Sequence, residues 1–331
     1  MSDAYAQVQE VAMVAVRCAA GVCRTVQQRL VSADTLEKKD RSPVTVADFA
    51  SQAVVCAHLA KHFPLDVMIA EEDSKELRQL DQAVIRKAVV EQVSNGMGCS
   101  VNDEQVLDWI DRGGAVPTGS VSPSRFWTLD PIDGTKGFLR GGQYAVALAL
   151  IEDGRVVLGL LGCPNLLVDG KPGALFVAGQ DSGAYVAPLW DDQAAVQAIR
   201  VSDVADPAQA RFCESVESGH SSHSDAAKIA QKLGITGESV RMDSQAKYAT
   251  VARGEASIYL RLPTRADYVE KIWDHAAGWM VITEAGGRVT DIAGKPLQFT
   301  HGRTLQANRG IIATNGSIHD AVVGAVGQVL S

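Results

Sequence analysis

The sequence predicts an α+β protein with an antiparallel sheet, followed by a region of α/β alternation. Two turn signals of the first half, Asp153-Gly154 and Asp181-Ser182-Gly183, each divide an apolar run into two strands, as hairpin turns do. Beyond about residue 195, strand-like runs alternate with helical ones, which is typical of an α/β lobe. We therefore expect two lobes, 1–195 and 196–331.

The first part of the chain is expected to be helical. Apolar residues recur at steps of three and four over 8–26, which predicts a long amphipathic helix. A second helix is expected to begin near Thr45, to carry Asp48 in its first turn and to end at a Phe-Pro pair, because proline stops helical continuation. The apolar run 66–70 predicts a buried strand that ends at Glu71.

The remaining elements follow from the same patterns of apolar residues and turn residues. In chain order we expect helices over 75–94 and 102–112, a Gly-, Pro- and Ser-rich loop over 113–123, strands over 126–129, 144–152 and 155–163, a hairpin within 174–187, a strand over 212–216, helices over 222–233 and 245–253, a strand over 256–262, a helix over 274–286, strands over 288–291 and 310–314, and a helix from 317. No internal repeat and no low-complexity tract interrupts this order in the sequence.

Composition limits the class of protein. With 46% hydrophobic and 21% charged residues, the 331-residue chain has the composition of a soluble globular enzyme with a sizeable core. Its net charge of -8 disfavours a protein that wraps nucleic acid, but allows a small phosphorylated substrate in a local basic pocket. The six cysteines show no CxxC pair and no zinc-binding spacing, so reduced thiols are expected. A monomer is the favoured state.

The sequence indicates neither a signal peptide nor a membrane span. Its first residues lack a basic region followed by a long apolar run, and no stretch approaches about 18 uninterrupted apolar residues. We expect a cytoplasmic protein without a membrane partner. Arg17, Arg24 and Arg29 on the amphipathic opening stretch leave import into an organelle open, although Asp3 and Glu10 favour a core helix instead.

A short acidic stretch, Asp130-Pro-Ile-Asp-Gly-Thr135, follows an apolar strand-like run. Pro131 and Gly134 favour a turn, which would bring the carboxylates of Asp130 and Asp133 together. Oxygen ligands of this kind suit a hard cation such as Mg²⁺. Taken alone, such a stretch is more often a solvated loop, so its meaning depends on the other acidic residues of the chain.

Further acidic residues lie at the ends of expected elements, where side chains can converge on a cleft. Asp48 lies at a helix start, Glu71 follows a strand and Asp274 opens a helix. Asp274 has an alternative role as a helix N-cap, because its carboxylate can accept a backbone N–H of the first turn. The sequence contains no GxxxxGK[ST] loop and no GxGxxG fingerprint after a strand, which argues against a P-loop kinase or a dinucleotide oxidoreductase.

Three stretches in order resemble the signatures of one family: Ala70-Glu-Glu-Asp-Ser74, Asp130-Pro-Ile-Asp-Gly-Thr135 and Trp273-Asp-His-Ala-Ala-Gly278. They are similar to those of the Mg²⁺-dependent, lithium-sensitive phosphatases of the inositol monophosphatase superfamily. Within it, the chain most resembles the 3'(2'),5'-bisphosphate nucleotidases, on the stretches 130–138, 215–223, 243–248 and 259–263. The resemblance covers almost the whole chain. It implies the layered αβαβα sandwich of the inositol monophosphatase and fructose-1,6-bisphosphatase type.

The resemblance also implies a set of metal ligands. Glu71, Asp130 and the backbone carbonyl of Ile132 look like ligands of one Mg²⁺. A second Mg²⁺ would be held by Asp130, Asp133 and Asp274, so that Asp130 bridges the two ions. A third, weaker Mg²⁺ is implied near Glu71. Such a pair of ions lowers the pKa of a bound water and stabilises the attacking and leaving oxygens of an in-line displacement.

Thr135 and Asp48 look like a proton relay. A threonine hydroxyl is a poor base by itself, but when it is hydrogen-bonded to a carboxylate it can pass on a proton of the attacking water. Water rather than Thr135 is therefore the expected nucleophile. For an isolated threonine after a glycine, hydrogen bonding within the turn would be the ordinary role.

Lys247 and Arg261 are the basic residues expected to hold the phosphate that the metal ions do not hold. Arg261 lies between two leucines in a strand-like run, and its guanidinium can bind phosphate with a bidentate fork. His220 and Ser244 match nucleotide-contacting positions of the nucleotidases. The spacing leaves His223 open as the alternative to His220.

Thr135 of the expected relay and Asp274 of the expected metal site complete the expected substrate contacts. His275, beside Asp274, is expected to be a structural hydrogen-bond partner rather than a ligand.

The activity implied by the resemblance is removal of the 3'-phosphate of adenosine 3',5'-bisphosphate (PAP), which gives AMP and phosphate. The related sulfated nucleotide PAPS is a second candidate substrate. An inositol polyphosphate 1-phosphatase or an inositol monophosphatase remains an alternative, because its metal core would be the same. A catalytically silent nucleotide or metal sensor is an alternative of another class. The choice of a nucleotide depends on the stretch 220–261 rather than on the acidic residues.

Overall fold

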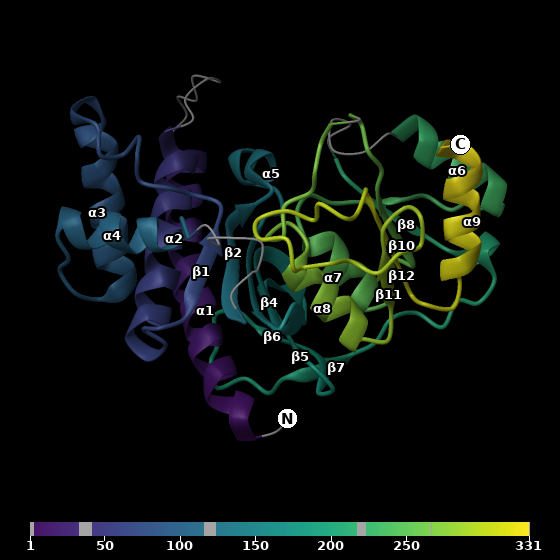
Figure 1. Ribbon diagram of the computed structural model, residues 1–331, viewed down its shortest axis with the longest axis horizontal. Coiled ribbons are helices and arrows are strands. Elements are labelled where there is room, and N and C mark those ends of the chain that lie inside the picture. The colour runs from purple at the N-terminus through teal and green to yellow at the C-terminus, as the bar shows by residue number, and fades with distance from the viewer. Residues whose placement is uncertain (1–2, 33–41, 116–123, 217–222, 266, 331) are drawn as a thin grey trace.

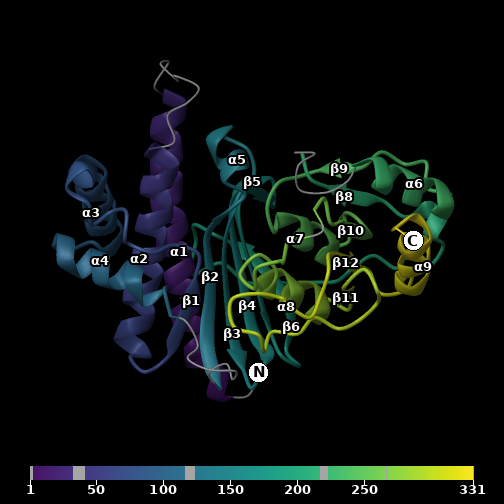
Figure 2. The same ribbon diagram turned by 45° about the horizontal axis from the view of Figure 1, so that its top comes forward.

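The structure, a computed structural model, describes residues 3–32, 42–115, 124–216, 223–265 and 267–330. Its elements stack in five layers in the order helices, sheet, helices, sheet, helices (Figure 1). Figure 2 shows the same succession from a second direction, with α7 and α8 between the two sheets. The layered αβαβα sandwich implied by the sequence is thus confirmed.

Four helices form the first outer layer. They are α1 (Asp3–Ser32), α2 (Ser42–His62), α3 (Ala83–Met97) and α4 (Asp103–Arg112), and a 3-10 turn at Leu80–Gln82 precedes α3. The periodic apolar face of α1 is buried, and its small residues Ala12, Ala15 and Ala19 are fully covered. Alanines allow α1 to approach α2 and the first sheet closely, so burial of this face stabilises the layer.

The first sheet has seven strands in the order β1-β2-β3-β4-β5-β6-β7. They are β1 (Val67–Ala70), β2 (Arg125–Asp133), β3 (Ala145–Glu152), β4 (Arg155–Val168), β5 (Lys171–Gly179), β6 (Gly183–Pro188) and β7 (Gln197–Ile199). β1 and β2 are parallel, and every other neighbouring pair is antiparallel. The parallel pair matters for the site, because β1 and β2 end at the same edge.

Both expected hairpins are present. In the turn between β3 and β4, Asp153 has φ 48° and Gly154 has φ 77°, as a type I' turn requires. The second turn joins β5 to β6 through Asp181, with φ 58°. The carboxylate of Glu284 accepts hydrogen bonds from the backbone N–H groups of this second turn at 2.9–3.1 Å. The helix that carries Glu284 is thereby tied to the sheet.

Two helices, α7 (Ala246–Ala252) and α8 (Ala276–Glu284), form the middle layer. One hydrophobic core joins their side chains to both sheets, with residues such as Phe176 of the first sheet and Ala313 of the second. The helices approach each other closely at Gly278, where an added Cβ would lie 2.3 Å from the ring of Tyr248. A larger residue at Gly278 would separate α8 from α7.

The second sheet has five strands in the order β11-β12-β10-β8-β9. They are β8 (Phe212–Glu214), β9 (Val240–Arg241), β10 (Ile258–Arg261), β11 (Arg288–Thr290) and β12 (Ile311–Thr314). Helices α6 (His223–Leu233) and α9 (His319–Leu330) cover its outer face around a separate apolar core. A 3-10 turn, Pro207–Gln209, precedes β8. Strands and helices thus alternate along this part of the chain, as expected.

Several expected boundaries are wrong. Helix α2 begins at Ser42 rather than near Thr45, which places Asp48 in its second turn. Helix α3 begins at Ala83, because Gln79 has extended backbone dihedrals and interrupts the helical turns before it. Strand β2 does not end before the acidic stretch but runs through it to Asp133. These differences shift elements without changing their order.

The division into lobes 1–195 and 196–331 stays a prediction, although β7, just beyond the expected boundary, pairs with the first sheet. All six cysteines are free thiols, as expected. No helix in the described part of the chain combines the length and the apolar character that crossing a membrane requires.

Candidate active site

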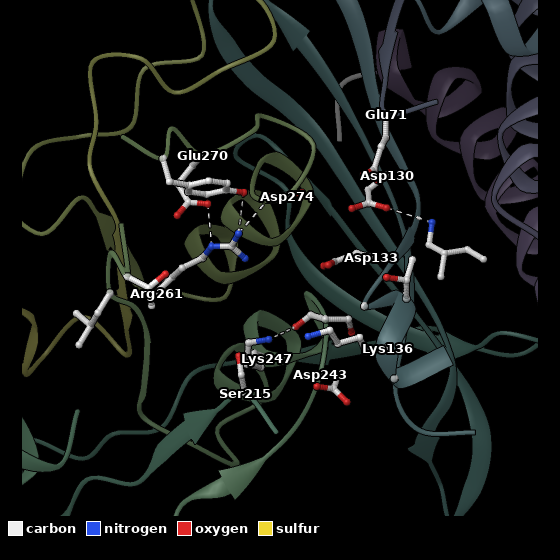
Figure 3. A pocket seen from close by; sticks show the side chains of 18 of the residues that line it. Glu71, Asp130, Asp133, Lys136, Ser215, Asp243, Lys247, Arg261, Glu270 and Asp274 are labelled. Carbon is white, nitrogen blue, oxygen red and sulfur yellow. Dashed lines mark hydrogen bonds and ion pairs between the residues drawn. The ribbon is translucent and has the colours of Figure 1, made fainter. Parts of the chain in front are cut away.

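A pocket of about 400 Å³ opens between the edge where β1 and β2 end and the second sheet. Its walls carry Glu71, Asp130 and Asp133 on the side of the first sheet. Arg261, Glu270 and Asp274 lie across the pocket from them, and Lys247, Lys136 and Asp243 border it from a third side (Figure 3). The pocket therefore has an acidic wall that faces Arg261, with Lys247 and Lys136 on a third side.

The end of β2 positions two of the carboxylates. The register of β2 with β3 shifts between Asp130 and Asp133, so an irregularity, not a turn, brings both side chains to the same edge. Asp130 is 3% exposed and accepts a hydrogen bond at 3.1 Å from the backbone N–H of Ile132. The carbonyl of Pro131 accepts one from the hydroxyl of Ser51 at 3.0 Å. This contact holds the irregular strand end against α2.

A left-handed glycine follows directly. Gly134 has φ 90°, which a residue with a Cβ adopts only at a cost. An added Cβ at Gly134 would also lie 2.9 Å from the Cβ of Ser244. The chain then enters the short helix α5 (Thr135–Leu139), and Thr135 lines the pocket.

Glu71 lies just beyond the end of β1, beside the end of β2. Its backbone N–H donates to the carbonyl of Leu129 at 3.3 Å, continuing the parallel pairing. The amide of Gln52 in α2 bonds both backbone groups of Glu72, at 2.8 and 3.1 Å. Arg303 donates to the carbonyl of Ala70 at 2.6 Å. Because hydrogen bonds fix the backbone on both sides of Glu71, they also fix the position from which its side chain extends along the acidic wall.

Asp274 comes from the segment before α8. The alternative role of Asp274 as an N-cap is not found, because the N-cap residue of α8 is His275 and no side chain caps this helix end. The carboxylate of Asp274 instead lies in the pocket wall, 3.5 Å from a terminal nitrogen of Arg261. Its neighbour His275 bonds the hydroxyl of Tyr248 at 2.9 Å and Glu270 at 3.1 Å, which agrees with its expected structural role.

Electrostatics distinguish this acidic wall from a solvated loop. Burial, Glu72 and Asp133 raise the pKa of Glu71 to about 7. Burial raises the pKa of Asp274 to about 7 against the opposing effect of Arg261. The pKa of Asp130 is raised well above its ordinary value by burial, by Glu71 and by Asp133. Carboxylates that destabilise one another in this way are stabilised by a cation between them.

The donor set fits divalent cations of the Mg²⁺ type. The acidic wall offers carboxylate oxygens together with the backbone of Ile132, which also lines the pocket, and hard cations prefer such oxygen donors. A second group of potential metal ligands, Glu270, Asp274 and His275, has ligand atoms within 4.8 Å of one another. Arg261 already pairs with Glu270 at 2.7 Å. A guanidinium therefore occupies the place that a metal ion would take in that second group.

Asp48 and Thr135, the expected relay, are not joined by a hydrogen bond in the described structure. Thr135 borders the pocket, whereas Asp48 is not among its lining residues. Asp48 is 8% exposed, and burial together with Glu72 and Glu71 raises the pKa of its carboxyl. Asp48 thus lies close enough to the acidic wall to feel its charge. The relay role stays a prediction.

The expected nucleotide contacts are brought together in part. Lys247 and Ser244 line the pocket, and the ammonium of Lys247 donates to the carbonyl of Ser244 at 2.9 Å. The same ammonium lies 5.1 Å from the ring centre of Tyr259, and burial lowers the pKa of Lys247. His220 lies outside the described residues, and so does the side chain of His223.

Sequence reasoning missed residues that hold the site together. Gln245 is 2% exposed; its backbone N–H donates to Asp133 at 2.5 Å. Its side-chain amide donates to the carbonyl of Trp273 at 2.8 Å and accepts from the backbone N–H of Gly278 at 3.0 Å. Gln245 therefore links the end of β2 to the segment that carries Asp274. Gln245 lies in the stretch 243–248 that resembles the nucleotidases, but no sequence pattern identifies its linking role, because its partners are distant in the chain.

Comparison with known proteins agrees with this geometry. The family model described as "Inositol monophosphatase family" matches residues 5–331. A 3'(2'),5'-bisphosphate nucleotidase of Emericella nidulans is 47% identical, over 89% of this chain and 91% of that protein. One of Schizosaccharomyces pombe is 42% identical, over 98% of this chain and 96% of that protein.

Solved structures agree at the level of the fold. An inositol monophosphatase from Anabaena superposes with a TM-score of 0.61 at 22% identity, over 97% of this chain and 96% of that one. Each of the three sequence signatures contributes an acidic residue to one pocket of this fold: Glu71, Asp130 with Asp133, and Asp274. The family match spans nearly the whole chain. The chain belongs to the inositol monophosphatase family.

Proposed function

We propose that the chain is a phosphomonoesterase that removes the 3'-phosphate from adenosine 3',5'-bisphosphate and releases AMP and phosphate. PAPS is proposed as a second substrate. The observation that carries the proposal is the pocket itself, in which an acidic wall faces Lys247 and Arg261. A bisphosphate needs a separate binding site for each phosphate. In this pocket the acidic wall would bind one phosphate through cations, and the basic residues would bind the other. The names of the 41–47% identical relatives support a nucleotide as the carrier of both phosphates.

The proposed cofactor is Mg²⁺, with two ions per site and a third, weaker one near Glu71. Glu71, Asp130 and the carbonyl of Ile132 would hold one ion, and Asp130, Asp133 and Asp274 the other. When bound, the ions would supply a water of lowered pKa and neutralise the charge that develops on the phosphate.

Thr135 and Asp48 would take up the proton that the attacking water loses. The oxygen of water attacks phosphorus in line, while the bond from phosphorus to the 3'-oxygen breaks and that oxygen takes up a proton from a solvent water molecule. The proton lost by the water passes through Oγ1 of Thr135 to the carboxylate of Asp48. The nucleotide would contact six residues: Thr135, His220, Ser244, Lys247, Arg261 and Asp274. We further propose a cytoplasmic monomer without nucleic acid or membrane partners.

Turnover of competing substrates tests the proposal. The purified enzyme with Mg²⁺ is expected to release phosphate from adenosine 3',5'-bisphosphate faster than from inositol 1,4-bisphosphate or inositol 1-phosphate, and lithium is expected to inhibit this release. Faster release from an inositol phosphate would contradict the proposal. Binding of AMP without turnover of any of these substrates would instead indicate the sensor.

A further inference from the structure

We infer that Glu270 is a positioning residue for Arg261: it holds the guanidinium in the orientation that binds the second phosphate of the substrate and limits its contact with Asp274 to one long ion pair. This inference rests on the proposed function and extends it, because it names what sets the specificity of the site. Glu270 lines the pocket but belongs to none of the three family signatures.

The geometry of Arg261 is the first step. Its Nε lies 2.7 Å from a carboxylate oxygen of Glu270, whereas its nearest contact with Asp274 is 3.5 Å (Figure 3). The Nε contact fixes the plane of the guanidinium, because Nε is the nitrogen nearest the side-chain stem. The hydroxyl of Tyr268 accepts a hydrogen bond from Nη2 at 3.2 Å. Arg261 is therefore anchored on the side of the pocket away from the acidic wall.

The anchor itself is rigid. Glu270 is 5% exposed, and the same oxygen that meets Arg261 lies 3.1 Å from Nε2 of His275, which is fully buried. Nδ1 of His275 lies 2.9 Å from the hydroxyl of Tyr248. If the tyrosine hydroxyl donates to Nδ1, then Nε2 carries the proton and donates to Glu270. Although burial opposes ionisation, His275 and Arg261 hold the pKa of Glu270 below its ordinary value.

Charge explains why a carboxylate is needed at this place. A carboxylate in the wall of a pocket for a doubly phosphorylated ligand repels that ligand, so it has no value as a direct contact. Paired with Arg261, it neutralises a buried charge and leaves the direction of the guanidinium defined. Without it, the remaining carboxylate near Arg261 is Asp274, one of the proposed cation ligands. The guanidinium would then compete with the cation for Asp274.

Two variants and a control test this inference. Glu270→Gln removes the charge and keeps the volume, and Glu270→Asp keeps the charge but withdraws it from Arg261. Glu255→Gln is the matched control, because the exposed Glu255 also pairs with an arginine, Arg253, at 2.6 Å but lies outside the pocket. For each protein, kcat and KM are measured on adenosine 3',5'-bisphosphate and on adenosine 3'-monophosphate, and Mg²⁺ binding is titrated calorimetrically without substrate.

Glu270→Gln is expected to raise KM for the bisphosphate by at least about tenfold, as expected when one partner of a buried charge pair is lost. KM for the monophosphate should change much less, because that substrate has no second phosphate. The affinity for Mg²⁺ should also fall, since Arg261 turns toward Asp274. Glu270→Asp should change each quantity in the same direction by a smaller amount, and it serves as the test if Glu270→Gln does not fold.

Equal changes of KM on both substrates, together with Mg²⁺ binding equal to that of Glu255→Gln, would overturn the inference. The inference would also be overturned if Glu270→Gln still raised KM for the bisphosphate relative to the monophosphate in an Arg261→Met variant, where no guanidinium remains to be positioned. Failure of the proposed function gives a different result: the unmutated enzyme would not hydrolyse the bisphosphate. In that case the Mg²⁺ titration still decides whether Glu270 keeps Arg261 from Asp274.

Discussion

Neighbouring carboxylates of β2 differ in what already satisfies them. Asp133 accepts a backbone hydrogen bond from Gln245. Asp130 is nearly enclosed; it accepts one from the nearby backbone N–H of Ile132 and lies against the carboxyl of Glu71. Asp133 is therefore part of the connection between the layers, and Asp130 depends more on a cation. Single substitutions can separate these two roles.

Asp133→Asn is expected to leave the fold intact, because the amide oxygen can still accept from Gln245. It removes one negative charge from the proposed cation site. Mg²⁺-dependent phosphate release should fall at least about 100-fold, the size found when a group that stabilises developing charge is removed. The melting temperature, measured in parallel, should stay near that of the unmutated protein. Unchanged turnover would refute the role of Asp133 as a metal ligand.

Gln245→Leu is expected to destabilise the protein. It leaves the buried carbonyl of Trp273 and the N–H of Gly278 without their partner, at about 1–3 kcal/mol for each unsatisfied group. The free energy of unfolding, measured by urea titration, should fall by that order. Gln231→Leu on the exposed face of α6 is the control and should be nearly neutral. A small effect of Gln245→Leu would mean that water replaces the lost hydrogen bonds.

At the scale of elements, the sequence predicted types and order better than ends. The hairpin between β3 and β4 could be predicted, because the dipeptide Asp153-Gly154 by itself provides the two left-handed positions that the turn needs. The irregular end of β2 could not be, because its shape depends on Ser51 in α2 and on the pairing with β3. Similarly, Asp274 follows the helix-cap pattern, but tertiary contacts direct it into the pocket. Long-range partners leave no local pattern in the sequence.

The close approach of α7 and α8 gives a prediction for an element. Gly278→Ala places a methyl group 2.3 Å from the ring of Tyr248, and overpacking of this kind costs about 1–3 kcal/mol. Gly324→Ala in α9 is the matched control, because its Cβ would meet nothing within 4 Å, and alanine in an exposed helix should stabilise by about 0.5–1 kcal/mol. Thermal melting should shift in opposite directions for the two variants. A stabilised Gly278→Ala would show that α8 can move without cost.

For the whole molecule, a few buried polar residues connect layers that apolar packing alone would leave free to slide. His319 of α9 bonds Thr290 of β11 and Thr314 of β12, both at 2.9 Å. The hydroxyl of Thr290 already donates to the carbonyl of Asp291 at 2.9 Å, so Nε2 of His319 must be the donor to Thr290. Nδ1 then accepts from Thr314, and a charged imidazole does not fit this arrangement.

This arrangement gives the stability a dependence on pH. Burial, together with Arg288, lowers the pKa of His319 to about 4. Because the unfolded chain binds a proton below about 6.5 and the folded chain does not, the free energy of unfolding should decrease as the pH falls from about 6.5 to 4, by up to about 3 kcal/mol. The difference between the unmutated protein and His319→Gln, measured by urea unfolding at several pH values, isolates this contribution. A difference that is independent of pH would contradict it.

The acidic wall of the pocket and the segment from Arg261 to Glu270 are carried by different layers. Glu71, Asp130 and Asp133 come from the first sheet, whereas Arg261 ends a strand of the second sheet and Glu270 follows it. The segment 261–270 can therefore be exchanged without altering the three carboxylates of the first sheet, provided that Asp274, the proposed cation ligand beside Arg261, keeps its place. For protein engineering, this separation makes the second sheet the place to search for new phosphate esters on the same hydrolytic core.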